Sequence, residues 1–211
     1  MNDYIREFLI GFGISFIFSL PPGMISLNVM QTTTQQGIKG AFWLALAAVL
    51  VEAVQAFIGV QFSGWINTRP SIQTGLELFV IPVFIVMGIM NIVAGLKSRK
   101  HNQKDDHQPR KTIGSFWKGL LVSALNPVAI PFWVVWASGM SSKNLLIFET
   151  SHILVFVLAT TLGTFACLML YALFSAFVVR KFKAIKQWMN LLIGILFIGL
   201  ALFQLINIMM K

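Results

Sequence analysis

Residues 8–30 read FLIGFGISFIFSLPPGMISLNVM, and no charged side chain occurs in this stretch. A helix needs roughly 20 mainly apolar residues to cross the hydrocarbon core of a bilayer, so the stretch is long enough to span one. Pro21 and Pro22 stand in its second half. Because proline lacks a backbone N–H and clashes with the preceding helical turn, the stretch predicts a membrane-spanning helix that is interrupted near Pro22.

The rest of the chain has the same apolar character. Of its 211 residues, 57% are hydrophobic and 11% are charged, and the mean hydropathy is +0.80. This composition is typical of integral membrane proteins and excludes a soluble domain as the main body of the protein. We therefore predict an all-α integral membrane protein with six transmembrane helices, at residues 8–30, 41–60, 78–96, 119–140, 153–179 and 188–210.

A charged segment, residues 97–118, divides the predicted spans into two sets of three. Its core, KSRKHNQKDDHQPRK, has no apolar periodicity and is typical of a flexible cytoplasmic linker. An odd number of spans in each half gives the two halves opposite orientations, which is the arrangement of inverted repeats in transporters. We predict a single membrane domain over residues 1–211, built from repeats 8–96 and 119–210.

The fourth predicted helix contains a proline break at a position equivalent to that in the first. Asn126 is followed by Pro127; Asn is a preferred N-cap and Pro is tolerated at the first helical position, so the pair predicts a helix start inside the membrane. The N-terminal ends of two such half-helices present N–H groups that bind small anionic groups, such as a carboxylate. The alternative is a pair of structural kinks without a ligand. The predicted substrate-binding residues are Pro22, Gly23, Asn28, Asn126 and Pro127.

Glu52 is the only acidic residue within the six predicted spans. A carboxylate at membrane depth is costly and is typical of proton carriers and cation ligands. Gln55 follows three residues later, on the same helix face. We predict that Glu52 and Gln55 take part in proton coupling. The alternative is a neutral Glu52 that hydrogen-bonds to a neighbouring helix for packing.

Lys and Arg residues are distributed unevenly over the two sides of the six-helix arrangement. The three loops on one side carry twelve of them, and the opposite side, which includes both termini, carries four. Since basic residues are retained on the cytoplasmic side, both termini are predicted outside. The net charge of +9 comes from these loops, where contact with anionic membrane lipid explains it and nucleic-acid binding is not indicated.

The sequence offers few other groups for chemistry. Cys167 is the only cysteine, which excludes an intramolecular disulfide and a two-thiol redox pair. His101, His107 and His152 all lie outside the predicted spans, and the first two belong to the charged linker. The sequence contains no zinc-ligand cluster, Ser-His-Asp constellation or nucleotide-binding loop. We therefore expect no enzyme activity, no metal site and no cofactor.

Two motifs resemble those of the LysE/RhtB family of bacterial amino-acid exporters. They are LPPGMISLNVMQTTTQQGIKGAFW at residues 20–43 and GLLVSALNPVAIPFW at residues 119–133. The acid in the second predicted span, Glu52, is a further feature that resembles the family. The chain departs from the family where Pro-Pro-Gly-Met replaces the usual Pro-Gly-Pro, and where Val51 precedes Glu52 in place of Gly-Asp. The resemblance covers nearly the whole chain and identifies it as a divergent member.

The resemblance implies a multi-pass protein of the bacterial inner membrane that exports amino acids or related small metabolites, driven by the proton gradient. Its partners would be the small-molecule substrate and membrane lipids, and a homodimer is left open. Two other functions stay open as alternatives. One is export of divalent metals or other ions by the same fold, and the other is a membrane scaffold or assembly factor without transport.

Overall fold

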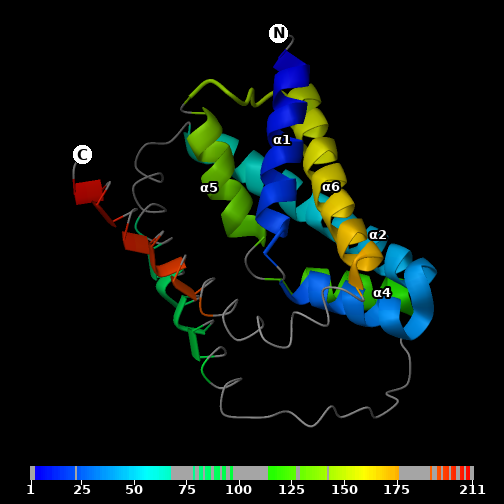
Figure 1. Ribbon diagram of the computed structural model, residues 1–211. Helices are drawn as coiled ribbons and strands as arrows, with labels where there is room; N and C mark the ends of the chain where they lie inside the picture. Colours follow the sequence, from blue (N-terminus) through cyan, green and yellow to red (C-terminus); the bar gives the residue numbers. More distant parts are fainter. Residues whose placement is uncertain are drawn as a thin grey trace. The chain divides into compact units, whose positions relative to one another are not determined.

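The computed structural model describes residues 3–21, 23–67, 114–126, 129–141 and 143–175, together with scattered positions between residues 78 and 96 and between residues 191 and 209. The regular structure in these parts of the chain is helical. Figure 1 labels the helices α1 (Asp3–Ser19), α2 (Met24–Asn67), α4 (Ser115–Ala124), α5 (Ala129–Ser141) and α6 (Thr150–Leu173).

The chain divides into two compact units. The first comprises Met1–Thr68 and Lys111–Val179, and the second comprises Arg69–Arg110 and Arg180–Lys211. All the labelled helices belong to the first unit. Each predicted repeat therefore supplies its first two spans to the first unit and its third span to the second.

In the second unit, two segments distant in sequence cross closely. The rings of Phe84 and Phe197 lie 5.7 Å apart. A Cβ atom added to Gly88 would lie 2.7 Å from the side chain of Ile198 and 3.0 Å from the carbonyl oxygen of Gly194. Glycine at this crossing thus allows two backbones to approach, as is common between membrane helices.

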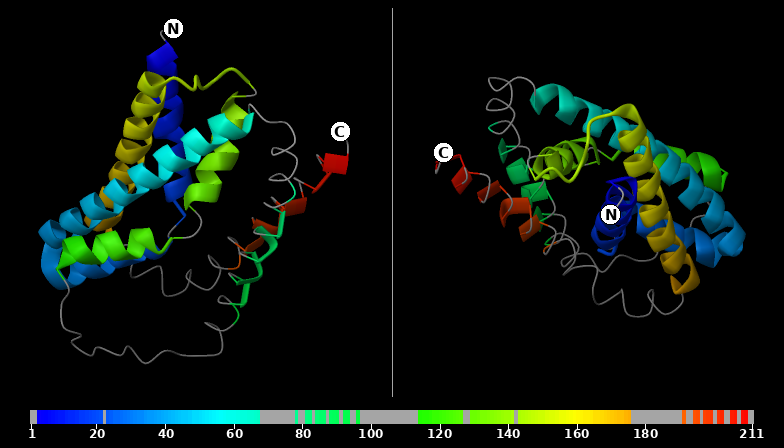
Figure 2. Two further views of the ribbon diagram at one scale, coloured as in Figure 1. Left: turned by 180° about the vertical axis from the view of Figure 1, so that it is seen from behind. Right: turned by 90° about the horizontal axis from the view of Figure 1, so that it is seen from above.

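Helices α1 and α6 lie side by side and run in the same direction, as Figures 1 and 2 show. Tyr4 contacts Ser151 near the start of both helices, and Ser15 contacts Thr164 further along. A Cβ atom on Gly163 would lie 2.5 Å from the carbonyl oxygen of Phe12, so this interface has no room for a larger residue. A shared direction is expected for the first and fifth spans of a six-helix protein.

Helix α2 has two parts that meet at Gly37. This residue has φ 75° and ψ −179°, a conformation in the left-handed half of backbone space that glycine adopts without strain. In Figure 1 the first part of α2 begins near the lower end of α1 and runs away from it, and the second part of α2 then turns back along the bundle. The loop expected between the first two spans is therefore mostly helical. Within this helix, Thr33 donates its hydroxyl to the carbonyl of Val29 at 2.9 Å.

The α4–α5 pair packs along the second part of α2. A Cβ atom on Gly119 of α4 would lie 2.2 Å from the Leu44 carbonyl oxygen, and Ser63 is hydrogen-bonded to Ser138 of α5 at 2.8 Å. The two short helices are bent by 61° at the break between them. A helix break therefore lies where the sequence predicts one, between Ala124 and Ala129, and α4 begins four residues before the expected start of the second repeat. That the two helices form one interrupted span stays a prediction.

The length and apolarity of the described helices agree with a membrane protein. Among the described residues, Met24–Ile66 and Thr150–Leu173 each qualify as a span, and α4 with α5 would be a third if the bent pair is one span. The helix break after Ser19, which the Pro21–Pro22 motif predicts, is also present. The predicted spans 78–96 and 188–210 are described only at scattered positions, so the total of six stays a prediction.

Two apolar clusters form the core of the first unit. One contains Ala56 and Val60 of α2 with Ile153 and Phe156 of α6, next to Trp133 of α5. The other is formed by residues 29–49 of α2 and residues 168–172 of α6. The clusters leave a gap on α2 between residues 49 and 56 and on α6 between residues 157 and 168, and polar side chains occupy it.

Candidate functional site

A layer of polar side chains separates the two apolar clusters of the first unit. It contains Glu52 and Gln55 from α2, Ser15 and Ser19 from α1, Thr164 from α6 and Ser123 from α4. Polar groups at this depth are costly unless they hydrogen-bond one another or a ligand, so their concentration in one layer marks a candidate site.

Glu52 is connected to the first helix break through Thr164. The hydroxyl of Thr164 donates to the Glu52 carboxylate at 3.2 Å. The same hydroxyl is hydrogen-bonded to Ser15 at 2.5 Å and accepts from Ser19 at 3.4 Å. Ser19 is the last residue of α1 and directly precedes the break. The half-buried carboxylate of Glu52 therefore lies next to the point where the first span is interrupted.

Gln55 is connected to the second helix break through Ser123. Its amide donates to the Ser123 carbonyl at 3.3 Å, and the same carbonyl accepts from the backbone N–H of Asn126 at 3.0 Å. The Ser123 hydroxyl in turn donates to the carbonyl of Ala48 at 2.9 Å. One turn of α2, from Glu52 to Gln55, thus reaches both interruptions.

Two buried polar atoms beside the second break lack a hydrogen-bond partner among the described residues. They are Oε1 of Gln55, an acceptor, and Nε1 of Trp133, a donor. The side chains are 9% and 1% exposed. Trp133 packs against Gly59, one helical turn beyond Gln55 on α2. Since buried polar atoms in proteins are usually paired, each of these two atoms has the capacity for one further hydrogen-bond partner.

The residues predicted from the proline motifs lie at the helix breaks. The Gly23 carbonyl accepts from the Leu27 N–H and the Ser26 hydroxyl, both at 3.0 Å. Asn28 donates its side-chain amide to the Met24 carbonyl at 2.8 Å, within its own helix. Neither Gly23 nor Asn28 is joined to Glu52 or Gln55 by a direct hydrogen bond in the described part of the chain. Pro22 and Pro127 lie outside the described residues.

Aromatic rings flank the site where the end of α1 meets α5. Phe18 lies 5.3 Å from Phe132 and 5.1 Å from Trp136, in both cases edge to face. The hydroxyl of Tyr171, from α6, donates to the carbonyl of Leu20 and so fastens the first break to α6. The aromatic rings of Phe18, Phe132 and Trp136 thus form an apolar region next to the helix breaks.

Four members of the polar layer were not expected from the sequence: Ser15, Ser19, Ser123 and Thr164. Ser15 and Ser19 are four residues apart and thus share one face of α1, which was the available signal. Hydroxyl groups are common in membrane helices, however, because they can hydrogen-bond within their own helix. The sequence did not indicate which of them face other helices.

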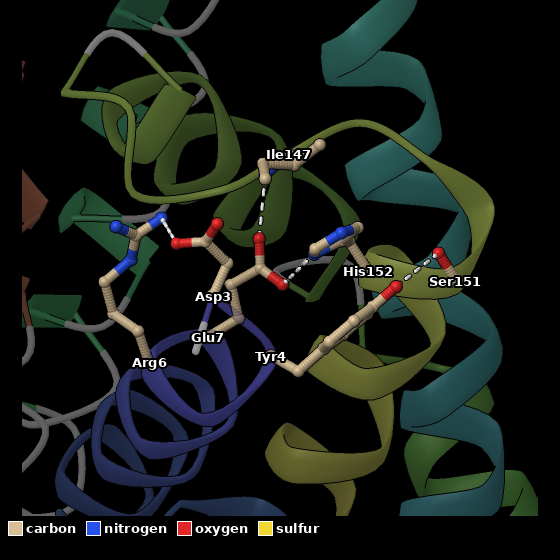
Figure 3. Close-up of polar contacts among 7 residues, drawn as sticks. All are labelled: Asp3, Tyr4, Arg6, Glu7, Ile147, Ser151 and His152. Atoms are coloured by element: carbon tan, nitrogen blue, oxygen red, sulfur yellow. Dashed lines mark hydrogen bonds and ion pairs between the residues drawn. The ribbon is translucent and has the colours of Figure 1, made fainter. Parts of the chain in front are cut away.

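Glu7 and His152 correct the expected placement of ionisable groups. The sequence placed both outside the spans, but Glu7 is 0% exposed in α1 and His152 is 7% exposed in α6. As Figure 3 shows, Nδ1 of His152 lies 2.7 Å from Oε2 of Glu7. Glu52 is therefore not the only carboxylate inside the helix bundle. Among the described residues, no group of three or more His, Cys, Asp or Glu could hold a metal ion.

Comparison with known proteins agrees with this architecture. The chain matches the LysE type translocator family over residues 16–207. It is 28% identical over 197 residues to a leucine efflux protein of Klebsiella pneumoniae, covering 90% of this chain and 89% of the relative. A leucine efflux protein of Salmonella typhimurium is 27% identical over 188 residues, with 86% of each chain covered. No solved structure matches. The chain therefore belongs to the LysE-type translocators, a family of multi-pass helical membrane transporters that are not enzymes.

Proposed function

We propose that this protein exports an amino acid or a related small metabolite from the cytoplasm across the bacterial inner membrane, by proton-coupled alternating access. The observation that carries the proposal is the turn of α2 between Glu52 and Gln55, which reaches both helix breaks inside a polar layer. A carboxylate and two interrupted helices at one depth are the features expected of a secondary transporter site.

The substrate site proposed from the sequence lies between the breaks at Pro22–Gly23 and Asn126–Pro127, with Asn28 on the first half-helix. The atoms of Gln55 and Trp133 that lack a partner among the described residues support a zwitterionic substrate. The amide oxygen of Gln55 would accept from an ammonium group, and the indole N–H of Trp133 would donate to a carboxylate. One acceptor and one donor are the kinds of group that the two charged ends of an amino acid require.

An apolar side chain on the substrate fits the neighbouring aromatic rings. Phe18, Phe132 and Trp136 offer apolar surface beside the breaks. The relatives named above are leucine efflux proteins, and leucine has a side chain of this kind. We therefore propose leucine or a similar apolar amino acid as the substrate.

In this proposal, Glu52 carries the coupling proton. Its one hydrogen bond from a side chain comes from a neutral hydroxyl, that of Thr164, among the described residues. A carboxylate with one weak donor can take up and release a proton without the loss of an ion pair. Gln55, one helical turn from Glu52, would couple the protonation of Glu52 to the binding of substrate. Both termini would lie outside, as the distribution of basic residues predicts.

The proposal is tested with the purified protein in vesicles that contain labelled leucine. We expect leucine to leave faster when the outside is acidic than when the two sides have equal pH. Divalent metal ions, tested in the same vesicles, should not move. Movement of a metal ion without leucine would favour the ion exporter, and movement of neither would favour a scaffold.

A further inference from the structure

An open pocket lies where the bend of α2 meets the start of α4, apart from the polar layer. It has a volume of about 370 Å³ and is lined by Gln36, Lys39, Gly40 and Trp43 of α2 and by residues 114–116. The hydroxyl of Ser115 donates to the side-chain oxygen of Gln36 at 2.6 Å and so joins the two helices beside the pocket. A Cβ atom on Gly40 would lie 2.8 Å from the Gln36 side chain and 3.3 Å from this hydroxyl, so a larger residue would displace both.

The pocket carries a positive charge that no described acid neutralises. Lys39 is exposed and forms no ion pair with another described residue. Three of the described acids, Asp3, Glu7 and Glu149, lie at the N-terminal ends of α1 and α6, which Figure 1 shows at the opposite end of the bundle from α4. The fourth, Glu52, is thirteen residues from Lys39, or about 20 Å along α2. Lys39 is therefore available to an anionic partner.

The start of α4 adds to this positive potential. Gly114 is the N-cap, no side chain caps the helix, and its first turn contains no acid. Lys118 follows at the same end of α4 and has no acidic partner among the described residues. A lysine near the positive end of a helix dipole is unfavourable, and a bound anion offsets the repulsion. Lys39 and the end of α4 would thus attract an anionic group into the pocket.

The aromatic residues around the pocket are of the kind found at a membrane surface. Trp43 lines the pocket, is exposed, and lies 6.4 Å from Phe116, edge to face. Trp117, next along α4, is exposed as well. Tryptophan is enriched at the level of the lipid headgroups, and the predicted spans 41–60 and 119–140 both begin beside these residues. The predicted orientation therefore places the pocket at the cytoplasmic edge of the bilayer.

We propose that this pocket binds the headgroup of an anionic phospholipid from the cytoplasmic leaflet. The phosphate would accept hydrogen bonds from the ammonium group of Lys39 and from N–H groups at the start of α4, and the acyl chains would contact Trp43 and Trp117. A soluble anion would gain nothing from exposed aromatic rings at the bilayer edge, which is why the lipid is favoured. The bound lipid would bridge the bend of α2 and the start of α4, which belong to different predicted repeats. The inference does not depend on what the protein transports.

The test measures which phospholipid associates with the purified protein. The protein is placed in phosphatidylcholine vesicles that contain brominated phosphatidylglycerol or, for comparison, brominated phosphatidylcholine. Bromine quenches tryptophan fluorescence on contact, and Trp43→Phe shows which part of the quenching comes from the pocket. The test variant is Lys39→Gln, and the matched control is Lys143→Gln, in the connection between α5 and α6. Both lysines are exposed, so both variants should fold.

We expect the wild type to quench more strongly with phosphatidylglycerol than with phosphatidylcholine. Lys39→Gln should lower the preference for phosphatidylglycerol about fivefold, the usual contribution of one lysine to attraction by anionic lipid. Lys39→Arg keeps the charge and should retain the preference, and Lys143→Gln should behave as the wild type. An unchanged preference in Lys39→Gln would overturn the proposal. So would an equal loss in Lys143→Gln, since that is the result of general surface charge.

A second measurement distinguishes a lipid from a soluble ligand. The melting temperature of the protein in a neutral detergent is followed as phosphatidylglycerol, glycerol phosphate or leucine is added, because a ligand of the native state raises it. Phosphatidylglycerol should raise the melting temperature of the wild type more than that of Lys39→Gln, and glycerol phosphate should have little effect on either. Equal stabilisation by glycerol phosphate would identify a soluble anion as the ligand and refute the lipid. Stabilisation by leucine that is lost in Lys39→Gln would refute it too, since the pocket would then belong to the substrate.

Discussion

Glu52 and Glu7, two acids inside the helix bundle of the first unit, differ in their burial and in their hydrogen-bond partners. Glu52 is half-buried, lies beside the helix breaks, and is hydrogen-bonded by the hydroxyl of Thr164. Glu7 is fully buried at the far end of the same α1–α6 interface, where a backbone N–H and an imidazole hold both of its oxygens. The difference agrees with the proposed role of Glu52, which would exchange partners during transport, whereas Glu7 holds α1 to α6 and to the connection that precedes α6.

Removal of the Glu7 carboxyl group should have the largest effect on stability. Glu7→Ala leaves His152 and the Ile147 N–H without an acceptor and opens a cavity. We expect a loss of about 3–5 kcal/mol in the free energy of unfolding, as for other broken buried pairs. Unfolding of the purified protein in detergent measures it. A loss no greater than that of Glu149→Ala would show that Glu7 does not hold the structure together.

Removal of the Glu52 carboxylate should affect transport more than stability. Glu52→Gln keeps size and polarity and can still accept from Thr164, so folding should survive. Gradient-driven export should fall by about 100-fold or more, a usual cost of losing a proton-transfer group. Leucine exchange needs no net proton transfer and should persist. Export and exchange in vesicles, with and without a pH gradient, distinguish this from a packing role, in which both rates would stay normal.

The hydroxyl of Thr164 is the group whose removal tests the surroundings of Glu52. Thr164→Val keeps the shape of the side chain and removes the hydroxyl that contacts Glu52, Ser15 and Ser19. We expect a loss of about 1–3 kcal/mol in stability, because the remaining polar groups lose a partner. The affinity for leucine should weaken as well. Unfolding and leucine-binding measurements on Thr164→Val and, as a control, on Thr161→Val would show whether position 164 is special.

Trp133 tests the proposed binding role more than the stability. Trp133→Phe removes an N–H that has no acceptor among the described residues and shrinks a ring that packs in an apolar cluster, so stability should fall by about 1–2 kcal/mol. If that N–H binds the substrate carboxylate, the Kd for leucine should rise about tenfold. Thermal shift with increasing leucine reports both quantities. An unchanged Kd would remove Trp133 from the proposed site.

The sequence was most informative where local chemistry determines the backbone. The prolines at 21, 22 and 127 predicted both helix breaks, because proline removes a backbone donor whatever surrounds it. Glu52 was singled out because a carboxylate in an apolar run is rare. Gly37 was harder to interpret, since its positive φ depends on how the two parts of α2 pack.

The sequence was least informative where function depends on contacts between distant residues. Glu7 directly precedes the first apolar run, residues 8–30, and so lies outside the predicted span. Its burial depends on His152, which is 145 residues away in sequence. Thr164 likewise became part of the site only when α1 and α2 were placed around it. Long-range pairings of this kind have no periodic signal along the chain.

The most direct test of proton-coupled export by Glu52 is the proton movement that leucine itself drives. Vesicles with the wild-type protein are loaded with leucine at equal pH on both sides, and the internal pH is followed as leucine leaves. The proposed mechanism predicts that the interior becomes acidic in the wild type and that Glu52→Gln abolishes this change. Leucine exit without acidification, or acidification of equal size in Glu52→Gln, would contradict it.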